Sequence, residues 1–241
     1  MPIHPAPYRD CLLMVTAAVA VPTALDAWLA TQPAVLALTA TAAATLATAA
    51  LWLRAHYPDD NGFGWADRVT LARLAITAVL AGQLAGQPTA AGTGVTLAAM
   101  ALLALVLDGI DGWLARRRGE ASAFGARLDM ETDAVLILIL CALIWAGDRT
   151  GAWVLAIGGL RYAFLMAQTV WPRLAAALPP SQRRRAVCAI QVGVLPICLL
   201  PAFPTNGVSL LAATALVLLC YSFTVDIHWL IRHGRPEPEP E

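Results

Sequence analysis

Long runs of apolar residues, separated by short polar segments, make up most of this 241-residue chain. Each run approaches the roughly 20 residues that an α-helix needs to cross a hydrocarbon core about 30 Å thick. The alternation typical of a membrane barrel strand is absent. Because lipid offers the backbone no hydrogen-bond partner, we expect helices. The eight predicted spans are 11–30, 33–53, 69–86, 91–115, 128–147, 151–171, 187–203 and 208–230.

Composition supports an integral membrane protein and excludes an ordinary soluble domain. Hydrophobic residues make up 59% of the chain and charged residues only 13%, and the mean hydropathy is +0.66. The fold class that we predict is all-α, with membrane lipids as surroundings and no nucleic-acid partner.

The arginines are sorted along the chain in a way that predicts the topology. Among the loops that follow odd-numbered spans, only Arg149 is present, whereas the loops after even-numbered spans and the C-terminal tail are rich in arginine. Arginine-rich loops stay in the cytoplasm. We therefore expect a protein of the cell (inner) membrane with both termini in the cytoplasm.

Polar segments divide the chain into regions. Residues 1–55 are predicted to form a two-helix membrane extension, with the first run kept as a helix rather than removed as a signal peptide. The turn-forming segment 56–68 is the predicted linker to the remaining spans. The last residues, 233–241, contain a Pro/Glu repeat and are predicted to be disordered.

Four aspartates interrupt spans four and five. Asp108 and Asp111 are three residues apart, and Asp129 and Asp133 are four apart, so on helices each pair projects from one face. Span four runs toward the cytoplasm and span five runs back. We therefore expect the two pairs to converge at the cytoplasmic side.

Four carboxylates in a partly desolvated place repel one another, so a cation must lie between them. Arg116 and Arg127 can neutralise part of the charge, but they do not explain a common centre. A hard divalent cation such as Mg²⁺ or Mn²⁺ does, and it completes its coordination with phosphates and water. No Cys or His lies nearby to favour a softer metal. The pattern predicts a metal–phosphate site.

These residues also carry a family resemblance. The string Asp108-x-x-Asp111-Gly112-x-x-Ala115-Arg116, eight residues, then Gly125-x-x-x-Asp129-x-x-x-Asp133 resembles at every position the signature of the CDP-alcohol phosphotransferases, or CDP-alcohol phosphatidyltransferases. The resemblance implies a six-helix catalytic membrane domain, here residues 62–232. It implies transfer of a substituted phosphoryl group from a CDP-linked alcohol to a hydroxyl with release of CMP, two Mg²⁺ or Mn²⁺ ions, and a homodimer.

The resemblance assigns roles position by position. Asp108, Asp111 and Asp129 are implied as metal ligands, and Asp133 is implied as the general base with a metal contact of its own. The small residues are implied to let cytidine and its phosphates approach the helices, since a larger side chain would block them. The implied nucleotide-binding positions are Gly112, Ala115, Arg116 and Gly125.

A weaker similarity lies upstream. The segment WADRVTLARL resembles the opening Pro-Asn-x-x-Thr-x-x-Arg element of the family, with Thr70 and Arg73 matching and Asp67 where Asn is usual. One interpretation places Asp67 and Thr70 near the nucleotide and Arg73 near phosphate. The other is a capped helix entry with interfacial arginines.

Two further arginine positions are candidates for binding the acceptor or its phosphate. Arg161 lies about ten residues from either end of its span, too deep to reach the interface comfortably, so it is expected to face the interior and pair with an anion. Arg183 begins a run of three arginines at the cytoplasmic start of span seven. The alternative for Arg161 is a structural ion pair, and the alternative for Arg183 is a positive-inside anchor or a contact with anionic lipid.

Three functions remain open on the sequence. The favoured one transfers phosphatidyl from CDP-diacylglycerol to the hydroxyl of a small polar alcohol, with or without a phosphate of its own. The second transfers a CDP-linked head group of the choline or ethanolamine type to diacylglycerol. The third, of another class, is a membrane cation transporter whose acids line a pore.

Overall fold

The computed structural model describes residue 20 and residues 32–56, 64–86, 91–118, 122–176, 178–179 and 181–233. Apart from Ala20, the predicted first span, 11–30, lies outside these residues, as do most of the linker and tail. The described residues form helices and no strands, which confirms the all-α class. The helices are α2 (Pro33–His56), α3 (Trp65–Gly82), η1 (Gln83–Ala85), α4 (Ala91–Arg118), α5 (Ala123–Ala146), η2 (Ala152–Val154), α6 (Leu155–Val170), η3 (Pro172–Ala175), α7 (Gln182–Leu199) and α8 (Thr205–His233).

Five helices among the described residues are long and apolar enough to cross a membrane. The two long helices outside this set, α5 and α7, carry charged residues in their first halves, namely the Asp129 segment and the Arg183 segment. Length and composition therefore support an integral membrane protein, while the count of eight spans stays a prediction. The five ranges are Pro33–His56, Trp65–Ala85, Thr93–Arg118, Ala152–Val170 and Thr205–His233.

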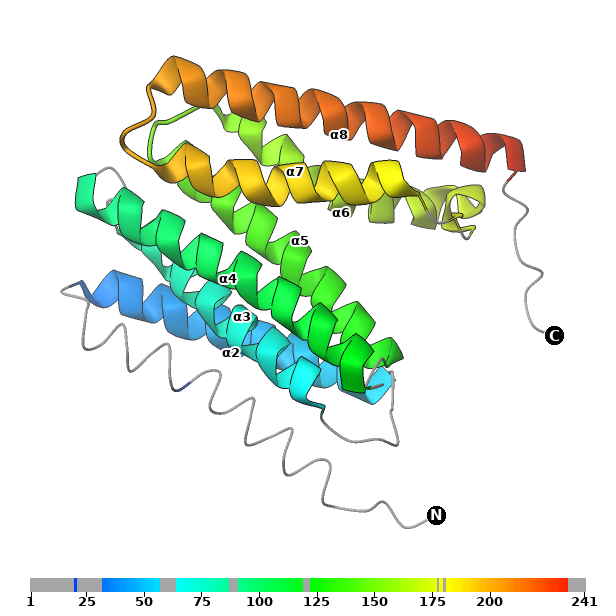
Figure 1. Ribbon diagram of the computed structural model, residues 1–241, viewed down its shortest axis with the longest axis horizontal. Coiled ribbons are helices and arrows are strands. Elements are labelled where there is room, and N and C mark those ends of the chain that lie inside the picture. Colours follow the sequence, from blue (N-terminus) through cyan, green and yellow to red (C-terminus); the bar gives the residue numbers. More distant parts are fainter. Residues whose placement is uncertain are drawn as a thin grey trace, which may run out of the picture.

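The helices form two groups that α5 connects. Helix α3 packs against α2, α4 and α5, while α7 packs against α8, α4 and α5. Figure 1 shows α5 running obliquely from the group of α2, α3 and α4 to the group of α6, α7 and α8. Because the groups diverge toward one end of the bundle, that end has an opening between α4 and α7.

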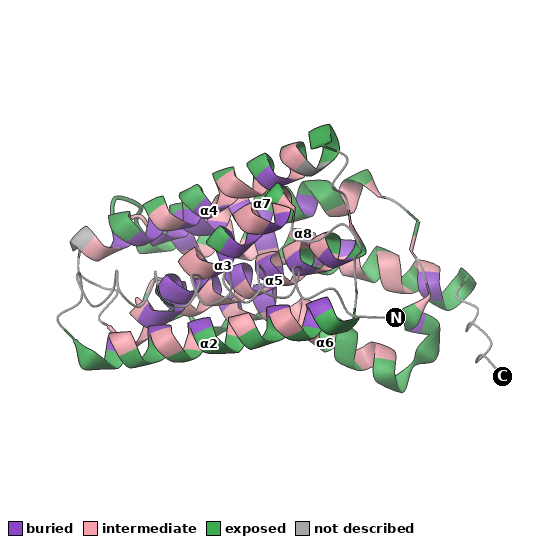
Figure 2. Cartoon of the chain, turned by 90° about the horizontal axis from the view of Figure 1, so that it is seen from below, coloured by how far each residue is buried: buried purple, intermediate pink, exposed green. Residues whose placement is uncertain are grey.

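The interior of the bundle is built from small and branched apolar residues. Leu140, Leu143 and Ile144 of α5 are fully buried against alanines of α4 and residues of α7 and α8. Glycine permits the closest approach: a Cβ at Gly158 of α6 would lie 2.6 Å from the Cα of Leu138 in α5. Figure 2 shows buried residues on the inner faces and exposed ones on the outer faces. Large apolar side chains are among the exposed residues, as expected for helices that face lipid.

Adjacent helices run in opposite directions, so their arginine-bearing termini meet at one end. The C-terminal ends of α2, α4, α6 and α8 and the N-terminal ends of α3, α5 and α7 lie at this end (Figure 1). Arg54, Arg68, Arg118, Arg173 and Arg183 are carried by these termini or by the short helix that follows α6. The arginines that the sequence concentrates in alternate loops therefore lie together at one end of the folded bundle. That this end is cytoplasmic stays a prediction.

Candidate active site

The four signature aspartates meet at the open end of the bundle. One carboxylate oxygen from each of Asp108, Asp111 and Asp129 lies within 4.8 Å of the others. Asp133, one helical turn after Asp129, joins them through an arginine that all four contact. The convergence expected from the spacing on α4 and α5 is therefore present. We call these four residues the aspartate cluster.

Arg73 of α3 lies at the centre of the aspartate cluster. Its side chain is 1% exposed, and its two terminal nitrogens contact all four carboxylates. Nη1 is 2.9 Å from Asp111 Oδ2 and 2.5 Å from Asp129 Oδ1, while Nη2 is 2.9 Å from Asp108 Oδ1 and also contacts Asp133. Sequence spacing did not indicate this, because the partners are 35 or more residues away on other helices.

The charges of this cluster do not balance. One guanidinium faces four carboxylates, so the ionised set retains a surplus of negative charge. Exposure is graded: the Asp111 side chain is 5% exposed, while Asp108 and Asp129 are 36% and 42% exposed toward the opening. An all-oxygen donor set with an open side fits a hard divalent cation that also binds phosphate. The residues present therefore fit Mg²⁺ or Mn²⁺.

Threonine hydroxyls support the buried part of the cluster. Thr70 Oγ1 donates to Asp111 Oδ2 at 3.0 Å, and Thr77 Oγ1 donates to the carbonyl of Arg73 at 2.8 Å. Both threonines are buried on the same helix as Arg73. The upstream element thus lies beside the signature, with Thr70 and Arg73 directed at the aspartates.

The glycines of the signature lie close to polar side chains of the same protein. A Cβ at Gly125 would lie 2.8 Å from Asp67 Oδ1, so glycine allows the start of α3 to approach α5. The other oxygen of Asp67 accepts a hydrogen bond from the Gly64 N–H at 3.0 Å, as in the capped-entry interpretation. At Gly112 the nearest group is the guanidinium of Arg116, 3.4 Å from a Cβ built there. The side chain of Ala115 lies outside the described residues.

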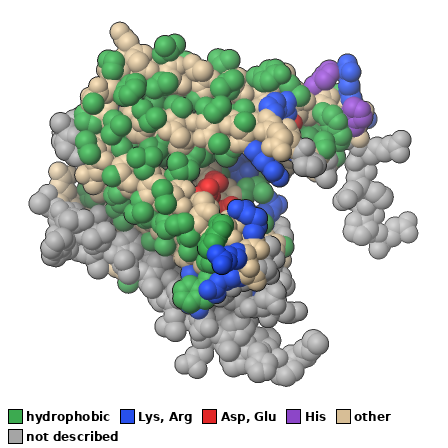
Figure 3. Space-filling model, in the orientation of Figure 1, with side chains coloured by type: hydrophobic (Ala, Val, Ile, Leu, Met, Phe, Trp, Pro, Cys, Tyr) green, Lys and Arg blue, Asp and Glu red, His purple; other side chains and the backbone are tan. Residues whose placement is uncertain are grey.

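A cavity of about 550 Å³ adjoins the aspartate cluster, between α5, α6, α7 and α8. Asp133 is the member of the cluster that lines it, and we call this space the acceptor cavity after the role that we propose for it below. Figure 3 shows acidic side chains inside a hollow with arginines on both sides of it. Other polar residues line the cavity as well: Arg127, Arg161, Gln168, Arg184, Cys188, Gln191, Ser222 and Asp226.

Ion pairs hold the arginines of this region. Arg161 Nη2 lies 2.6 Å from Glu131 Oε1, and Arg183 Nη2 lies 2.5 Å from Asp226 Oδ1. The expectation that Arg161 pairs with an anion is met by Glu131. Sequence patterns indicate no role in the site for Glu131 or Asp226. Helical spacing could have indicated the position of Glu131. It is two residues from both Asp129 and Asp133, so it projects from a different side of α5, where it faces Arg161 of α6.

The fold and site together define a polytopic helical membrane protein with an aspartate cluster at one end. The family model for CDP-alcohol phosphatidyltransferase matches residues 63–225, more than half of the chain and a range that includes every signature position. The chain belongs to the CDP-alcohol phosphatidyltransferase family. It is thus one of the membrane transferases of phospholipid synthesis, which act on CDP-linked substrates and generally use divalent metal ions. Comparisons with curated proteins and with solved structures found no match.

Proposed function

We propose that this protein transfers a phosphatidyl group from CDP-diacylglycerol to the hydroxyl of a small polar alcohol and releases CMP. The observation that carries the proposal is the position of Asp133, which belongs to the aspartate cluster and also lines the acceptor cavity. A donor phosphate at the cluster and a hydroxyl in the cavity would therefore meet at this residue.

Asp108, Asp111 and Asp129 would hold the divalent ions, with Asp133 completing the set. Two bound Mg²⁺ or Mn²⁺ ions would neutralise the pyrophosphate of the donor and the negative charge of departing CMP. Thr70 fixes the orientation of Asp111 by its hydrogen bond, so the most buried ligand is positioned in advance. Arg116, which lies beside Gly112, and Asp67, which lies beside Gly125, are the proposed nucleotide contacts.

Asp133 would act as the general base. It takes the proton of the acceptor hydroxyl while that oxygen forms a bond to the β-phosphorus of the donor. The bond from the β-phosphorus to the bridging oxygen breaks, and that oxygen leaves as part of CMP. Atoms and charges balance without a covalent enzyme intermediate.

The acceptor cavity favours an alcohol that carries an anionic group. Gln191 is 4% exposed, lines the cavity and has no partner for its amide nitrogen. The Nε groups of Arg161 and Arg183 are likewise buried without an acceptor. Buried donors without partners are costly, and phosphate oxygens would satisfy them. Arg161 and Gln191, which line the cavity, are thus proposed acceptor contacts, and Arg183 is proposed as a third because its ion-pair partner Asp226 lines the cavity.

The proposal places the active site at the cytoplasmic face and the protein in a homodimer. Support for the orientation comes from the arginine-rich termini around the site, which the positive-inside rule assigns to the cytoplasm. The dimer rests on the family resemblance alone.

The test is CMP release by the purified protein in nanodiscs with Mg²⁺. CDP-diacylglycerol is offered with glycerol phosphate, inositol phosphate, glycerol, inositol or serine, and CDP-choline or CDP-ethanolamine is offered with diacylglycerol. We expect release with CDP-diacylglycerol, fastest with a phosphorylated acceptor, and release slower by about 100-fold or more in Asp133→Asn. Release only with a CDP-linked head group would support the second chemistry. No CMP with any donor, together with Mg²⁺ flux into liposomes, would favour a transporter.

A further inference from the structure

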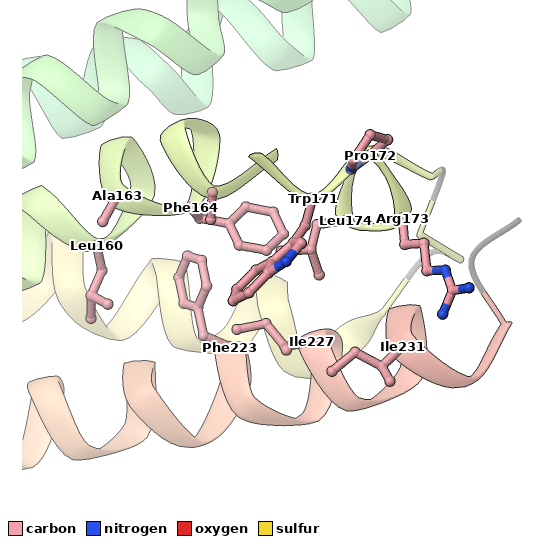
Figure 4. Close-up of a pocket in the computed structure, with 11 residues that line it drawn as sticks. Leu160, Ala163, Phe164, Trp171, Pro172, Arg173, Leu174, Phe223, Ile227 and Ile231 are labelled. Carbon is pink, nitrogen blue, oxygen red and sulfur yellow. The ribbon is translucent and has the colours of Figure 1, made fainter. Parts of the chain in front are cut away.

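A second cavity, of about 600 Å³, lies on the side of α6 and α8 near the arginine-rich end. Figure 4 shows its side chains pointing into the space between these helices, with η3 closing one end. We call it the lateral groove. All but one of its lining residues are apolar: Leu160, Ala163, Phe164, Ala167, Trp171, Pro172, Leu174, Phe223, Ile227 and Ile231, with Arg173 as the exception.

Two aromatic rings separate the lateral groove from the acceptor cavity. Phe164 of α6 and Phe223 of α8 line both spaces, and their rings meet edge to face with centroids 5.5 Å apart. No residue of the aspartate cluster lines the groove. A lipid in the groove with its phosphate at Arg173 therefore lies on the other side of this aromatic pair from the aspartates.

The length of the groove corresponds to one leaflet of a bilayer. Along α6 it extends from Leu160 to Trp171, about 16 Å at the rise of an α-helix. Half of the hydrocarbon core is about 15 Å. Trp171 is 66% exposed at the end of the helix, which is where tryptophan marks the membrane interface. The groove therefore extends from the interface to near the middle of the membrane.

Arg173 gives the groove its charge. It is exposed on η3 at the interfacial end, and in Figure 4 its guanidinium points toward the end of α8. It has no ion pair or hydrogen bond with the described residues, in contrast to Arg161 and Arg183. Lipid tails are as apolar as the groove, so apolar burial alone selects no lipid there. A cationic group at headgroup depth does select, because it attracts lipid phosphate.

We propose that the lateral groove binds an anionic phospholipid of the surrounding membrane, with one acyl chain between α6 and α8 and its phosphate at Arg173. This lipid is distinct from the substrate, because the aromatic pair separates it from the aspartate cluster. Its binding does not depend on the proposed reaction.

The test is native mass spectrometry of the purified full-length protein with equimolar phosphatidylglycerol and phosphatidylcholine. We expect at least fivefold more bound phosphatidylglycerol. Arg173→Gln should reduce this preference to less than twofold, whereas Arg185→Gln, which removes the same charge at the start of α7, should leave it unchanged. Ala163→Trp fills the groove and should remove both lipids, while Val217→Trp, on the lipid-facing surface of α8, should not.

Other occupants would give different results. Equal losses in Arg173→Gln and Arg185→Gln would mean that lipid binds through general charge and would overturn the proposal. The proposal would also be overturned if CDP-diacylglycerol displaced bound phosphatidylglycerol at a much lower concentration than unlabelled phosphatidylglycerol does. That result would assign the groove to the donor substrate. Conversion of a dimer to a monomer by Ala163→Trp would assign it to a second copy. Asp133→Asn should keep the lipid, and size exclusion with thermal melting verifies that each variant folds.

Discussion

The aspartate cluster and the acceptor cavity are neighbours, yet the two sites distribute their charges in opposite ways. In the cluster a single guanidinium, that of Arg73, contacts four carboxylates. Around the cavity, arginines equal or outnumber their carboxylate partners: Arg161 pairs with Glu131, and Arg183 and Arg184 both contact Asp226. Asp133 is the residue that the two sites share.

The difference shows what each site requires from outside the chain. Surplus carboxylates at the cluster call for cations, and surplus donors around the cavity call for an anion. Phosphoryl transfer uses metal cations that bind the donor phosphates, and the proposed acceptor would bind in the cavity beside them. The following experiments test this contrast.

Removal of divalent metal should have the largest effect. We expect EDTA to abolish CMP release and Mg²⁺ or Mn²⁺ to restore it, because the surplus charge of the cluster cannot hold a pyrophosphate without cations. Asp129→Asn should raise the metal concentration needed for half-maximal activity by more than about tenfold. Activity that persists in EDTA would contradict the assignment of the cluster.

Asp133→Asn should lower kcat by roughly 10²–10⁴-fold, the usual contribution of a general base. The amide keeps the shape of the side chain but cannot take the proton, so binding of CDP-diacylglycerol should change little. Single-turnover CMP release and donor binding are measured in parallel. Unchanged turnover would remove Asp133 from the mechanism.

Arg73→Gln tests whether the guanidinium compensates the negative charge of the aspartate cluster. Removing one partner of a buried charged set typically costs about 3–5 kcal/mol, so we expect a marked fall in Tm of the metal-free protein. Mg²⁺ should raise the Tm of this variant more than that of the wild type, because the metal replaces the lost charge. Arg68→Gln, five residues earlier on α3, is the control. If Mg²⁺ raises the Tm of Arg73→Gln and of the wild type by the same amount, Arg73 does not compensate the charge of the aspartates.

Arg161→Gln should have the smallest effect and should be confined to the acceptor. A hydrogen bond to a charged group is worth about 1.5–3 kcal/mol, so the acceptor KM should rise roughly 10–100-fold while the donor KM stays constant. Glu131→Gln is the matched control, since it breaks the same ion pair but keeps the guanidinium. If both variants lower stability and neither changes KM, the pair is only structural.

Sequence patterns predicted the helices of the described residues well because the apolar runs are long. They did not predict the polar first turns of α5 and α7. The fifth span was predicted from residue 128, whereas α5 begins at Ala123, where the Ser122 side chain accepts a hydrogen bond from the Gly125 N–H. Hydropathy does not detect such a charged but helical segment. In the same way α7 begins at Gln182, ahead of the predicted 187.

The site was predictable only where residues are close in sequence. Asp108 with Asp111, and Asp129 with Asp133, are related by helical spacing, which places each pair on one face. The contacts of Arg73 with these aspartates, and of Asp226 with Arg183, join helices far apart in the chain. No spacing rule encodes such contacts, because they depend on how the helices pack.

The close approach of α2 to α3 has a consequence for shortening this chain. A methyl group at Gly82 of α3 would overlap Thr39 of α2, and nearer the site Leu53 of α2 shares a buried cluster with Leu71, Leu74 and Phe124. Helix α2 lies outside the range that matches the family, yet it covers the helix that carries Arg73. A protein cut to the family range would expose this apolar seam to lipid and lose the neighbour that keeps α3 in place. Helix α2 is thus a packing partner of the helix that carries Arg73, although it lies outside the range that matches the family.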